Sequence, residues 1–223
     1  AHPWLARVQG GNGAPDGTFN PNVNNQVLAI AVREDGKILI GGNFTSVGGQ
    51  TRNGLAEVSG TNGLVDSFNP NANSIVYSLA LQPDGKLLVA GFFTNIGGQA
   101  RNGLARLDPV TGLADSFNPN PNSHVNALVV QADGKILVGG NFHGANCIGG
   151  ATCDYLARVD GATGLADSFN PDANDTVNAI ALQQDGKVLA GGLFTSIGGQ
   201  SRNRFGRLSN DTAALSTLKV TQS

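Results

Sequence analysis

Apolar and polar positions alternate in short runs along the whole chain, a period that is typical of β-strands and not of helices. One unit shows the pattern clearly. Residues 76–81 alternate and are rich in strand-forming side chains, and residues 86–90 form a return strand too apolar to face water on either side. A third strand is predicted at 104–107, and a short fourth strand ends at Phe117. The sequence therefore predicts four short antiparallel strands in this unit.

Turns rich in glycine separate the runs. Asp84-Gly85 lies between the first two strands, and both residue types tolerate the positive φ of a two-residue type I′ hairpin turn. Glycine at the end of the second strand indicates a bulge or a close approach of the backbone. These glycines are Gly91 and the pairs Gly41-Gly42, Gly139-Gly140 and Gly191-Gly192.

The same pattern occurs four times. Asp-Gly-Lys begins at Asp35, Asp84, Asp133 and Asp185, and Phe-Asn-Pro begins at Phe19, Phe68, Phe117 and Phe169. Successive copies are about 50 residues apart, and four strands in a repeat of this length are typical of a β-propeller blade. We therefore predict a single all-β domain over residues 1–223, a propeller of four-stranded antiparallel blades. The repeats fall at about 22–70, 71–119, 120–171 and 172–220.

The phase of the repeats suggests how the propeller closes. Residues 1–21 match the third and fourth strands of a repeat, so we expect this half-blade to close the ring and remove two exposed sheet edges. Four blades are favoured on this count. Residues 215–220 could supply the fourth strand of the last blade instead, and the N-terminal half-blade would then be surplus to the ring. Five blades, or a fragment of a longer array, are therefore alternatives.

Longer stretches of the repeat carry a family likeness. The stretches Ile-Gly-Gly-Gln-x-Arg-Asn-Gly-Leu-Ala-Arg-Leu and Gly-Leu-x-Asp-Ser-Phe-Asn-Pro, together with Asp-Gly-Lys, resemble the delta-60 repeat, a bacterial β-propeller-like family. The strand plan is also similar to kelch repeats. The resemblance covers about residues 4–208, and it implies a propeller of exported or cell-surface proteins without a shared catalytic activity. The departures are a Cys-bearing insertion in the third unit, Phe92 where a second Gly is usual, and Arg204-Phe205-Gly206 in place of Gly-Leu-Ala.

Composition narrows the function classes. The formal net charge is −2 and the 14 basic residues are spread along the chain, which argues against a nucleic-acid surface. Apolar runs stay well short of the roughly 18 residues that suggest a membrane-spanning helix. The chain has no Met, so we expect the initiator, and any export signal, to have been removed.

The two cysteines, Cys147 and Cys153, lie close enough in sequence for a local disulfide. Free thiols are the alternative. Two thiols alone make a poor metal site, so we favour the disulfide, which would imply an oxidising compartment.

Catalytic patterns are not found, and no catalytic residue is predicted. The histidines are isolated in sequence, the Gly-Gly pairs lack the Gly-Lys-Ser/Thr of a phosphate loop, and too few carboxylates fall outside the repeat to nominate a glycosidase pair. Most polar residues recur once per repeat, which favours a structural role. We expect the repeated Asp of Asp-Ser-Phe to pair with the repeated Arg that follows the second strand. The two series are Asp66, Asp115, Asp167 and Arg52, Arg101, Arg202.

One segment breaks the repeat. Residues 141–155 are longer than the sister segments and carry both cysteines, and functional residues are often placed on loops held by a rigid scaffold. The candidate binding residues are His143, Asn146, Asp154 and Tyr155. A plain disulfide-stapled variable loop is the alternative.

The Asn-rich connectors between repeats are best explained as Asx-turns. Only the last connector has two carboxylates, so a weak Ca²⁺ site is placed there if anywhere. Its residues are Asp172, Asn174 and Asp175.

Together these features predict a non-enzymatic extracellular or cell-surface propeller that binds a protein partner or a cell-surface component, or acts as a scaffold. A carbohydrate- or Ca²⁺-binding, lectin-like module is the second hypothesis, and a hydrolase is the third. No cofactor is expected, and the sequence does not specify the partner or the oligomeric state.

Overall fold

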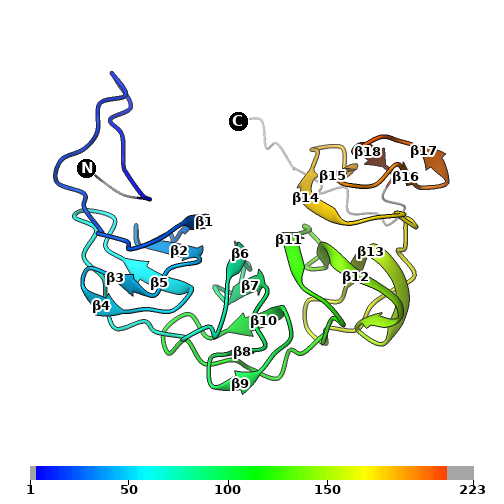
Figure 1. The fold of residues 1–223 in the computed structure, drawn as a ribbon, viewed down its shortest axis with the longest axis horizontal. Coiled ribbons are helices and arrows are strands. Elements are labelled where there is room, and N and C mark those ends of the chain that lie inside the picture. Colours follow the sequence, from blue (N-terminus) through cyan, green and yellow to red (C-terminus); the bar gives the residue numbers. More distant parts are fainter. Residues whose placement is uncertain (1–3, 210–223) are drawn as a thin grey trace, which may run out of the picture.

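The computed structural model describes residues 4–209 and folds as an open arc of four blades (Figure 1). The described residues contain only strands, turns and loops. Each blade is built on a three-stranded antiparallel sheet in which the second strand lies in the middle. The all-β propeller architecture predicted from the sequence is therefore confirmed.

The strands follow the repeat closely. The first strands are β1 (Val27–Val32), β6 (Val76–Leu81), β11 (Val125–Val130) and β14 (Val177–Leu182). The second strands are β2 (Ile38–Gly42), β7 (Leu87–Gly91), β12 (Ile136–Ile148) and β15 (Val188–Gly192). The third strands are β5 (Leu55–Val58), β10 (Leu104–Leu107), β13 (Ala151–Val159) and β18 (Phe205–Leu208). Small outer hairpins join the second and third strands in three blades: β3 (Ser46–Val47) with β4 (Gln50–Thr51), β8 (Asn95–Ile96) with β9 (Gln99–Ala100), and β16 (Ser196–Ile197) with β17 (Gln200–Ser201).

The fourth strand of each blade is shorter than expected. In blades one to three it is a single antiparallel bridge to the third strand, as between Leu107 and Ala114. The possible fourth strand at residues 215–220 lies outside the described residues. The phenylalanine that ends each fourth segment packs into the next blade, since Phe68 shares a buried cluster with Leu87 and Val89 of blade two.

The turn between the first two strands differs from the predicted type I′ turn. Gly85 has a φ of 83°, but Asp84 is not among the residues with positive φ. The Gly85 N–H donates to the Gln82 carbonyl oxygen at 2.9 Å, and the Lys86 N–H donates to Asp84 Oδ1 at 3.1 Å. This is a three-residue loop that ends in a left-handed glycine, so only the glycine needs the special backbone.

The strand register also corrects the expected alignment of Phe92 with the second glycine of the sister blades. Val76 pairs with Gly91, and the equivalent pair in blade one is Val27 with Gly42. Ala90 therefore occupies the position of Gly41, and Phe92 stands where the sister blades have Asn43, Asn141 and Leu193. A Cβ on Gly91 would lie 2.1 Å from the Ile75 carbonyl oxygen, which explains why glycine is needed there.

Neighbouring blades bury one continuous apolar layer between them. Leu39 and Leu55 of blade one pack with Leu87 and Val89 of blade two, and the same positions recur at the next two junctions. Such side chains are almost entirely removed from water, and burial of a Leu or Val contributes about 1.5–3 kcal/mol. Each blade is thus stabilised by its neighbours, as expected for a repeat array.

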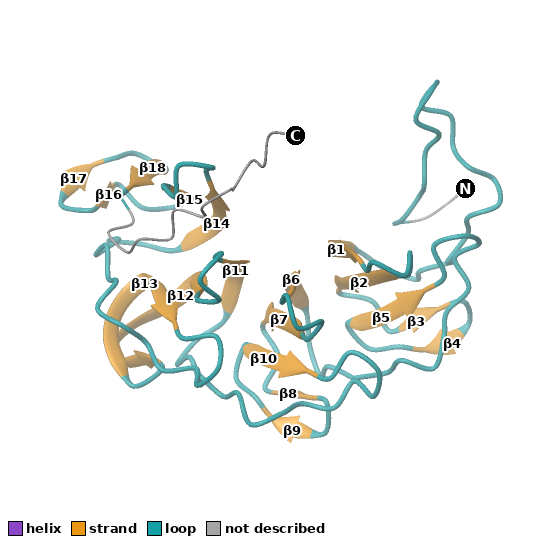
Figure 2. Cartoon of the chain, turned by 180° about the vertical axis from the view of Figure 1, so that it is seen from behind, coloured by secondary structure: helices purple, strands orange, loops and turns teal. Residues whose placement is uncertain are grey.

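The arc is open between its two ends (Figure 2). The N-terminal segment forms an outer half-blade beside blade one, where Val8 bridges Pro15 and the Arg7 guanidinium donates to the Gly60 carbonyl oxygen. Arg106 makes the same contact to Gly161 between blades two and three, which identifies residues 4–19 as the third and fourth strands of a preceding blade. The predicted closure of the ring by this half-blade stays a prediction.

No helix among residues 4–209 is long and apolar enough to cross a membrane.

Candidate functional site

The carboxylates that recur in every repeat stabilise the blades. Asp115 Oδ2 accepts hydrogen bonds from Arg106 Nε at 2.7 Å and from Lys86 Nζ at 2.9 Å. The same arginine lies over the Phe117 ring at 4.9 Å. Burial raises the pKa of Asp115, but hydrogen bonds from Arg106, the Phe117 N–H and Lys86 outweigh it, so the pKa lies below its usual value. Blade three repeats this arrangement with Asp167.

The predicted partners of these carboxylates were wrong. Arg52 and Arg101 donate to the backbone carbonyl oxygens of Asp66 and Asp115, and not to the carboxylates. The arginine that reaches the carboxylate lies on the third strand, beside the fourth segment, where the antiparallel bridge brings the two together. The repeated charged residues are thereby explained as structural.

The last connector does not gather its polar side chains into one site. Asn174 Oδ1 accepts the N–H groups of Thr195 and Ser196, and its Nδ2 donates to Thr195 Oγ1 at 2.8 Å. Asp175 Oδ1 caps the Thr176 N–H at 2.6 Å. Over residues 4–209 no three His, Cys, Asp or Glu side chains are grouped so that they could hold a metal ion. These hydrogen bonds to the backbone account for the side chains of Asn174 and Asp175, and a Ca²⁺ site in this connector stays a prediction.

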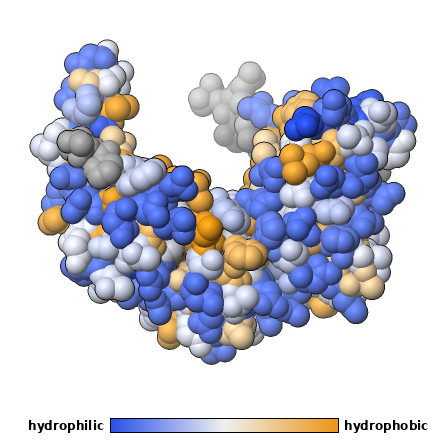
Figure 3. Space-filling model, viewed as in Figure 1, coloured by the Kyte–Doolittle hydropathy of each residue, from blue (hydrophilic) through white to orange (hydrophobic). Residues whose placement is uncertain are grey.

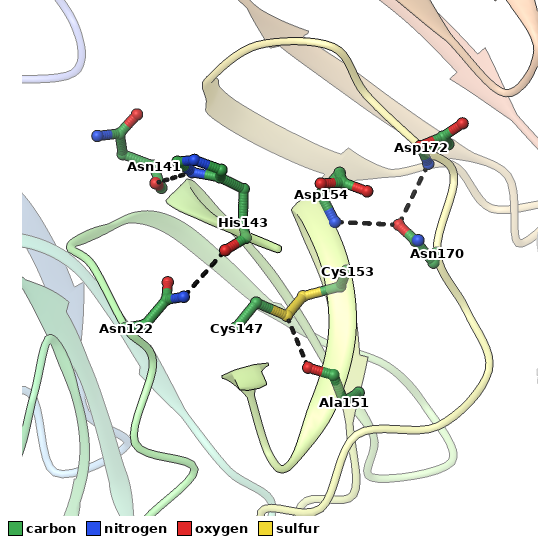
Figure 4. Close-up of a disulfide and its surroundings, with 9 residues drawn as sticks. All are labelled: Asn122, Asn141, His143, Cys147, Ala151, Cys153, Asp154, Asn170 and Asp172. Carbon is green, nitrogen blue, oxygen red and sulfur yellow. Dashed lines mark hydrogen bonds between the residues drawn. A yellow bond between two sulfur atoms is a disulfide. The ribbon is translucent and has the colours of Figure 1, made fainter. Parts of the chain in front are cut away.

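The segment that breaks the repeat extends blade three. Its second and third strands continue outward as one long hairpin of β12 and β13, in place of the separate outer hairpin of the sister blades. The predicted disulfide between Cys147 and Cys153 is present, with 5.8 Å between the Cα atoms (Figure 4). Both cysteines are buried in the core of the blade. Cys153 stands where blades one and two have Arg52 and Arg101, and its bond joins β13 to β12 instead of reaching the fourth segment as those arginines do.

The four candidate binding residues of this hairpin have different surroundings. The rings of His143 and Tyr155 are stacked, with centroids 5.0 Å apart and planes 16° from parallel. The Asp154 N–H donates to Asn170 Oδ1 at 3.2 Å, as Figure 4 shows. Asn146 is exposed and has a φ of 51°, a turn conformation that asparagine tolerates. The structure thus brings His143 and Tyr155 together and ties Asp154 to the last connector.

A second set of aromatic rings lies between blades two and three. The His124 ring meets the Phe92 ring edge to face at 5.4 Å and the Tyr77 ring at 6.4 Å. Phe92 is 56% exposed, although its neighbour Phe93 is buried. Burial lowers the pKa of His124, so this imidazole is neutral at neutral pH.

Phe92 and His124 border a cavity of about 280 Å³. The cavity is lined by Phe92, Phe93, Thr94, Asn102, Gly103, Pro121, Asn122, Ser123 and His124. The matching cavity between blades one and two has Asn43 in place of Phe92. Asn122 Nδ2 donates to the His143 carbonyl oxygen at 2.9 Å and so connects the cavity to the stacked pair. We call Tyr77, Phe92, His124, His143 and Tyr155 the aromatic face.

Sequence reasoning missed three members of this face. Each of Tyr77, Phe92 and His124 is the only aromatic residue at its repeat position, and the sequence predicts no contact among them. An alignment of the four repeats could have found them. It shows that these three aromatic residues do not repeat, and their positions fall on adjacent strand ends of two neighbouring blades.

Solved structures with a similar fold are β-propellers and related domains. The WD40 β-propeller domain of Doa1 superposes with a TM-score of 0.60 at 14% identity, over 92% of this chain and 57% of that chain. The computationally designed Ika4 protein superposes with a TM-score of 0.53 at 12% identity, over 79% and 91%. The extracellular domain of a hybrid two-component system from B. thetaiotaomicron gives a TM-score of 0.51 at 18% identity, over 85% and 22%.

At this identity the structural matches show a shared fold alone. The chain spans a little over half of the Doa1 chain and about a fifth of the chain of the two-component system's extracellular domain. No protein of curated function matches the sequence.

The family assignment comes from the sequence repeats. Four segments match a family described as a domain of unknown function (DUF5122) beta-propeller, at residues 33–67, 82–117, 131–162 and 183–211. They cover more than half of the chain and include the Asp-Gly-Lys turn of each blade. The chain therefore belongs to the DUF5122 β-propeller family.

Proposed function

We propose that this chain is a non-enzymatic, exported β-propeller that binds a protein partner through the aromatic face. The observation that carries the proposal is the place of the aromatic residues that do not repeat. The repeated phenylalanines pack inside the blades, whereas the aromatic residues that do not repeat form two ring contacts: His124 with Tyr77 and Phe92, and His143 with Tyr155. Partly exposed aromatic side chains next to a cavity are typical anchors of protein interfaces.

The hairpin that carries the stacked pair is rigid on two sides. The buried disulfide joins its two strands beside the Gly149-Gly150 turn, and the bond between Asp154 and Asn170 ties it to the next connector. A preformed surface of this kind loses little conformational entropy when a partner binds. The structural disulfide and the extracellular domain among the similar folds support an exported location.

A carbohydrate is the second candidate ligand. The exposed ring of Phe92 and the side chains of Asn102 and Asn122 line one cavity, and a sugar needs such an apolar ring surface with amides beside it. Phe93, which also lines the cavity, is buried, and the small apolar surface that Phe92 exposes favours the protein ligand over an extended glycan.

The test uses affinity capture from cell-surface extracts with matched variants. We expect Phe92→Ala and Tyr155→Ala to lose the captured partner, with Kd at least tenfold weaker in a binding titration of that partner. Val110→Ala is the control, because Val110 is 78% exposed but lies in a turn remote from the aromatic face. A further variant replaces residues 143–155 by the sister segment 94–103, which forms an ordinary outer hairpin in blade two. This variant should also lose the captured partner.

Equal capture by all four variants would refute the aromatic face as the binding surface. Binding to a glycan array by the wild-type chain, lost in Phe92→Ala, would replace the protein ligand by a carbohydrate.

A further inference from the structure

One connector asparagine uses its side-chain oxygen differently from its three sisters. In blades one, two and four, this oxygen accepts two backbone N–H groups from the segment that follows the second strand. In blade two, for example, Asn73 Oδ1 accepts the N–H groups of Thr94 and Asn95 at 2.9 and 3.0 Å. The equivalent residue of blade three is Asn122, and its Oδ1 accepts no hydrogen bond from any of residues 4–209.

The long hairpin of blade three causes this difference. His143 stands in the place of Thr94, and it pairs with Asp154 in the ladder between β12 and β13. Asn122 is still held, because its N–H donates to the Cys147 carbonyl oxygen at 2.8 Å and its Nδ2 donates to the His143 carbonyl oxygen at 2.9 Å. Figure 4 shows the amide nitrogen turned toward His143 and the amide oxygen turned away from it. Asn122 therefore presents a fixed acceptor that the fold itself does not use.

The unused acceptor belongs to the cavity beside Phe92, because Asn122 and Phe92 both line it. Phe92 is 56% exposed in a molecule whose face in Figure 3 is mostly hydrophilic. The sister cavity between blades one and two has Asn43 in place of this ring, and there Asn73 uses its oxygen within the blade. An exposed apolar ring and an unused acceptor thus come together at the junction of blades two and three.

The lining of the cavity restricts the charge of an occupant. The described residues that line it include no acid, lysine or arginine. Burial lowers the pKa of His124, so the imidazole is neutral at neutral pH. A charged group would lose its hydration there without gaining a counter-charge. The lining therefore fits a neutral group that combines an apolar body with a hydrogen-bond donor.

We propose that the cavity takes the indole ring of a tryptophan from the partner, with the indole N–H donating to Asn122 Oδ1 and the ring lying against Phe92. Tryptophan carries one donor and no acceptor on a large apolar ring, which matches an unused acceptor beside an exposed ring. Phenylalanine has no donor, and a tyrosine hydroxyl brings acceptor lone pairs of its own. This inference rests on the proposed function, since it names the side chain that the aromatic face takes from its partner.

Two small probes test the ring and its donor separately. N-acetyl-tryptophanamide and N-acetyl-phenylalaninamide are titrated into the chain, and the side-chain amide signals of Asn102 and Asn122 are followed by NMR. We expect the tryptophan probe to bind about three- to tenfold more tightly, which is the value of one hydrogen bond. Equal affinity for the two probes would overturn the proposal, and so would Asn122 signals that do not move.

Matched variants test the acceptor. Asn122→Ala should weaken the tryptophan probe to the affinity of the phenylalanine probe. Asn24→Ala is the control, because Asn24 makes the usual structural hydrogen bonds in blade one, and it should leave both affinities unchanged. Asn43→Phe gives the sister cavity a ring without an unused acceptor, so a second tryptophan site in this variant would contradict the role of the acceptor. Circular dichroism checks that the variants are folded.

Failure of this inference and failure of the proposed function give different results. If the chain does not discriminate between the probes but Phe92→Ala still loses the captured partner, the aromatic face stands and the tryptophan is wrong. If Phe92→Ala keeps the captured partner, the proposed function is wrong, whichever probe binds.

Discussion

Two adjacent phenylalanines of blade two allow the aromatic face to be separated from the core. Phe93 is 1% exposed and belongs to the buried cluster between blades one and two, whereas the next ring, Phe92, is 56% exposed beside the cavity. Truncation of each to alanine removes the same atoms from two different environments. The pair therefore isolates burial as the variable.

The expected magnitudes follow from that burial. Phe93→Ala removes a fully buried ring and leaves a hole in a close-packed layer, so we expect a loss of about 3–5 kcal/mol in the free energy of unfolding. Phe92→Ala removes a ring that is already more than half exposed to water, so its removal leaves no buried hole in the packing. Its loss should be about 1 kcal/mol, while binding of the partner falls at least tenfold.

Urea denaturation followed by circular dichroism measures both values, and a binding titration of the captured partner measures the second effect. The m-value should be unchanged, since neither ring alters the surface exposed on unfolding by much. If Phe92→Ala destabilised the protein as much as Phe93→Ala, Phe92 would be a core residue, and the aromatic face would lose its central member.

Three further results are expected. Replacing Cys147 and Cys153 by serine should lower the unfolding free energy by about 2 kcal/mol in urea titrations, because a short loop is released in the unfolded chain. Asp115→Asn should cost about 1 kcal/mol at pH 7. The wild type should also lose more stability than this variant as the pH falls below about 4, because a carboxylate with a lowered pKa contributes stability only while it is ionised. Gly91→Ala should lower the thermal midpoint, because the added Cβ would lie 2.1 Å from the Ile75 carbonyl oxygen. An unchanged midpoint would show that the strand end can shift freely.

Much of the fold could be predicted because the same strand and turn pattern occurs four times in the sequence. Strand formers, Asp-Gly turns and Phe-Asn-Pro segments recur about every 50 residues, and the first three strands of each blade lie where the pattern placed them. The fourth strand was overestimated, since it is a single bridge held by the Arg106–Asp115 contact and not by a ladder. The turn type was wrong because Asp-Gly suits two loop lengths, and sequence alone does not choose between them.

The candidate site was harder to predict. The disulfide was found because the cysteines are the only pair and lie close in sequence. Tyr77 and His124 are 47 positions apart and meet only because neighbouring blades place their first strands side by side. The partner of the repeated carboxylate was missed for a different reason. Arg106 is only nine positions from Asp115, and the antiparallel bridge between the third strand and the fourth segment decides that it, and not Arg101, reaches the carboxylate.

The phase of the repeat has a consequence for how such a protein can change its length. The phenylalanine that ends one unit completes the core of the following blade, as Phe117 does among the side chains of blade three. A gene that gains or loses one unit by unequal recombination would therefore keep every junction intact, wherever the crossover falls within the unit.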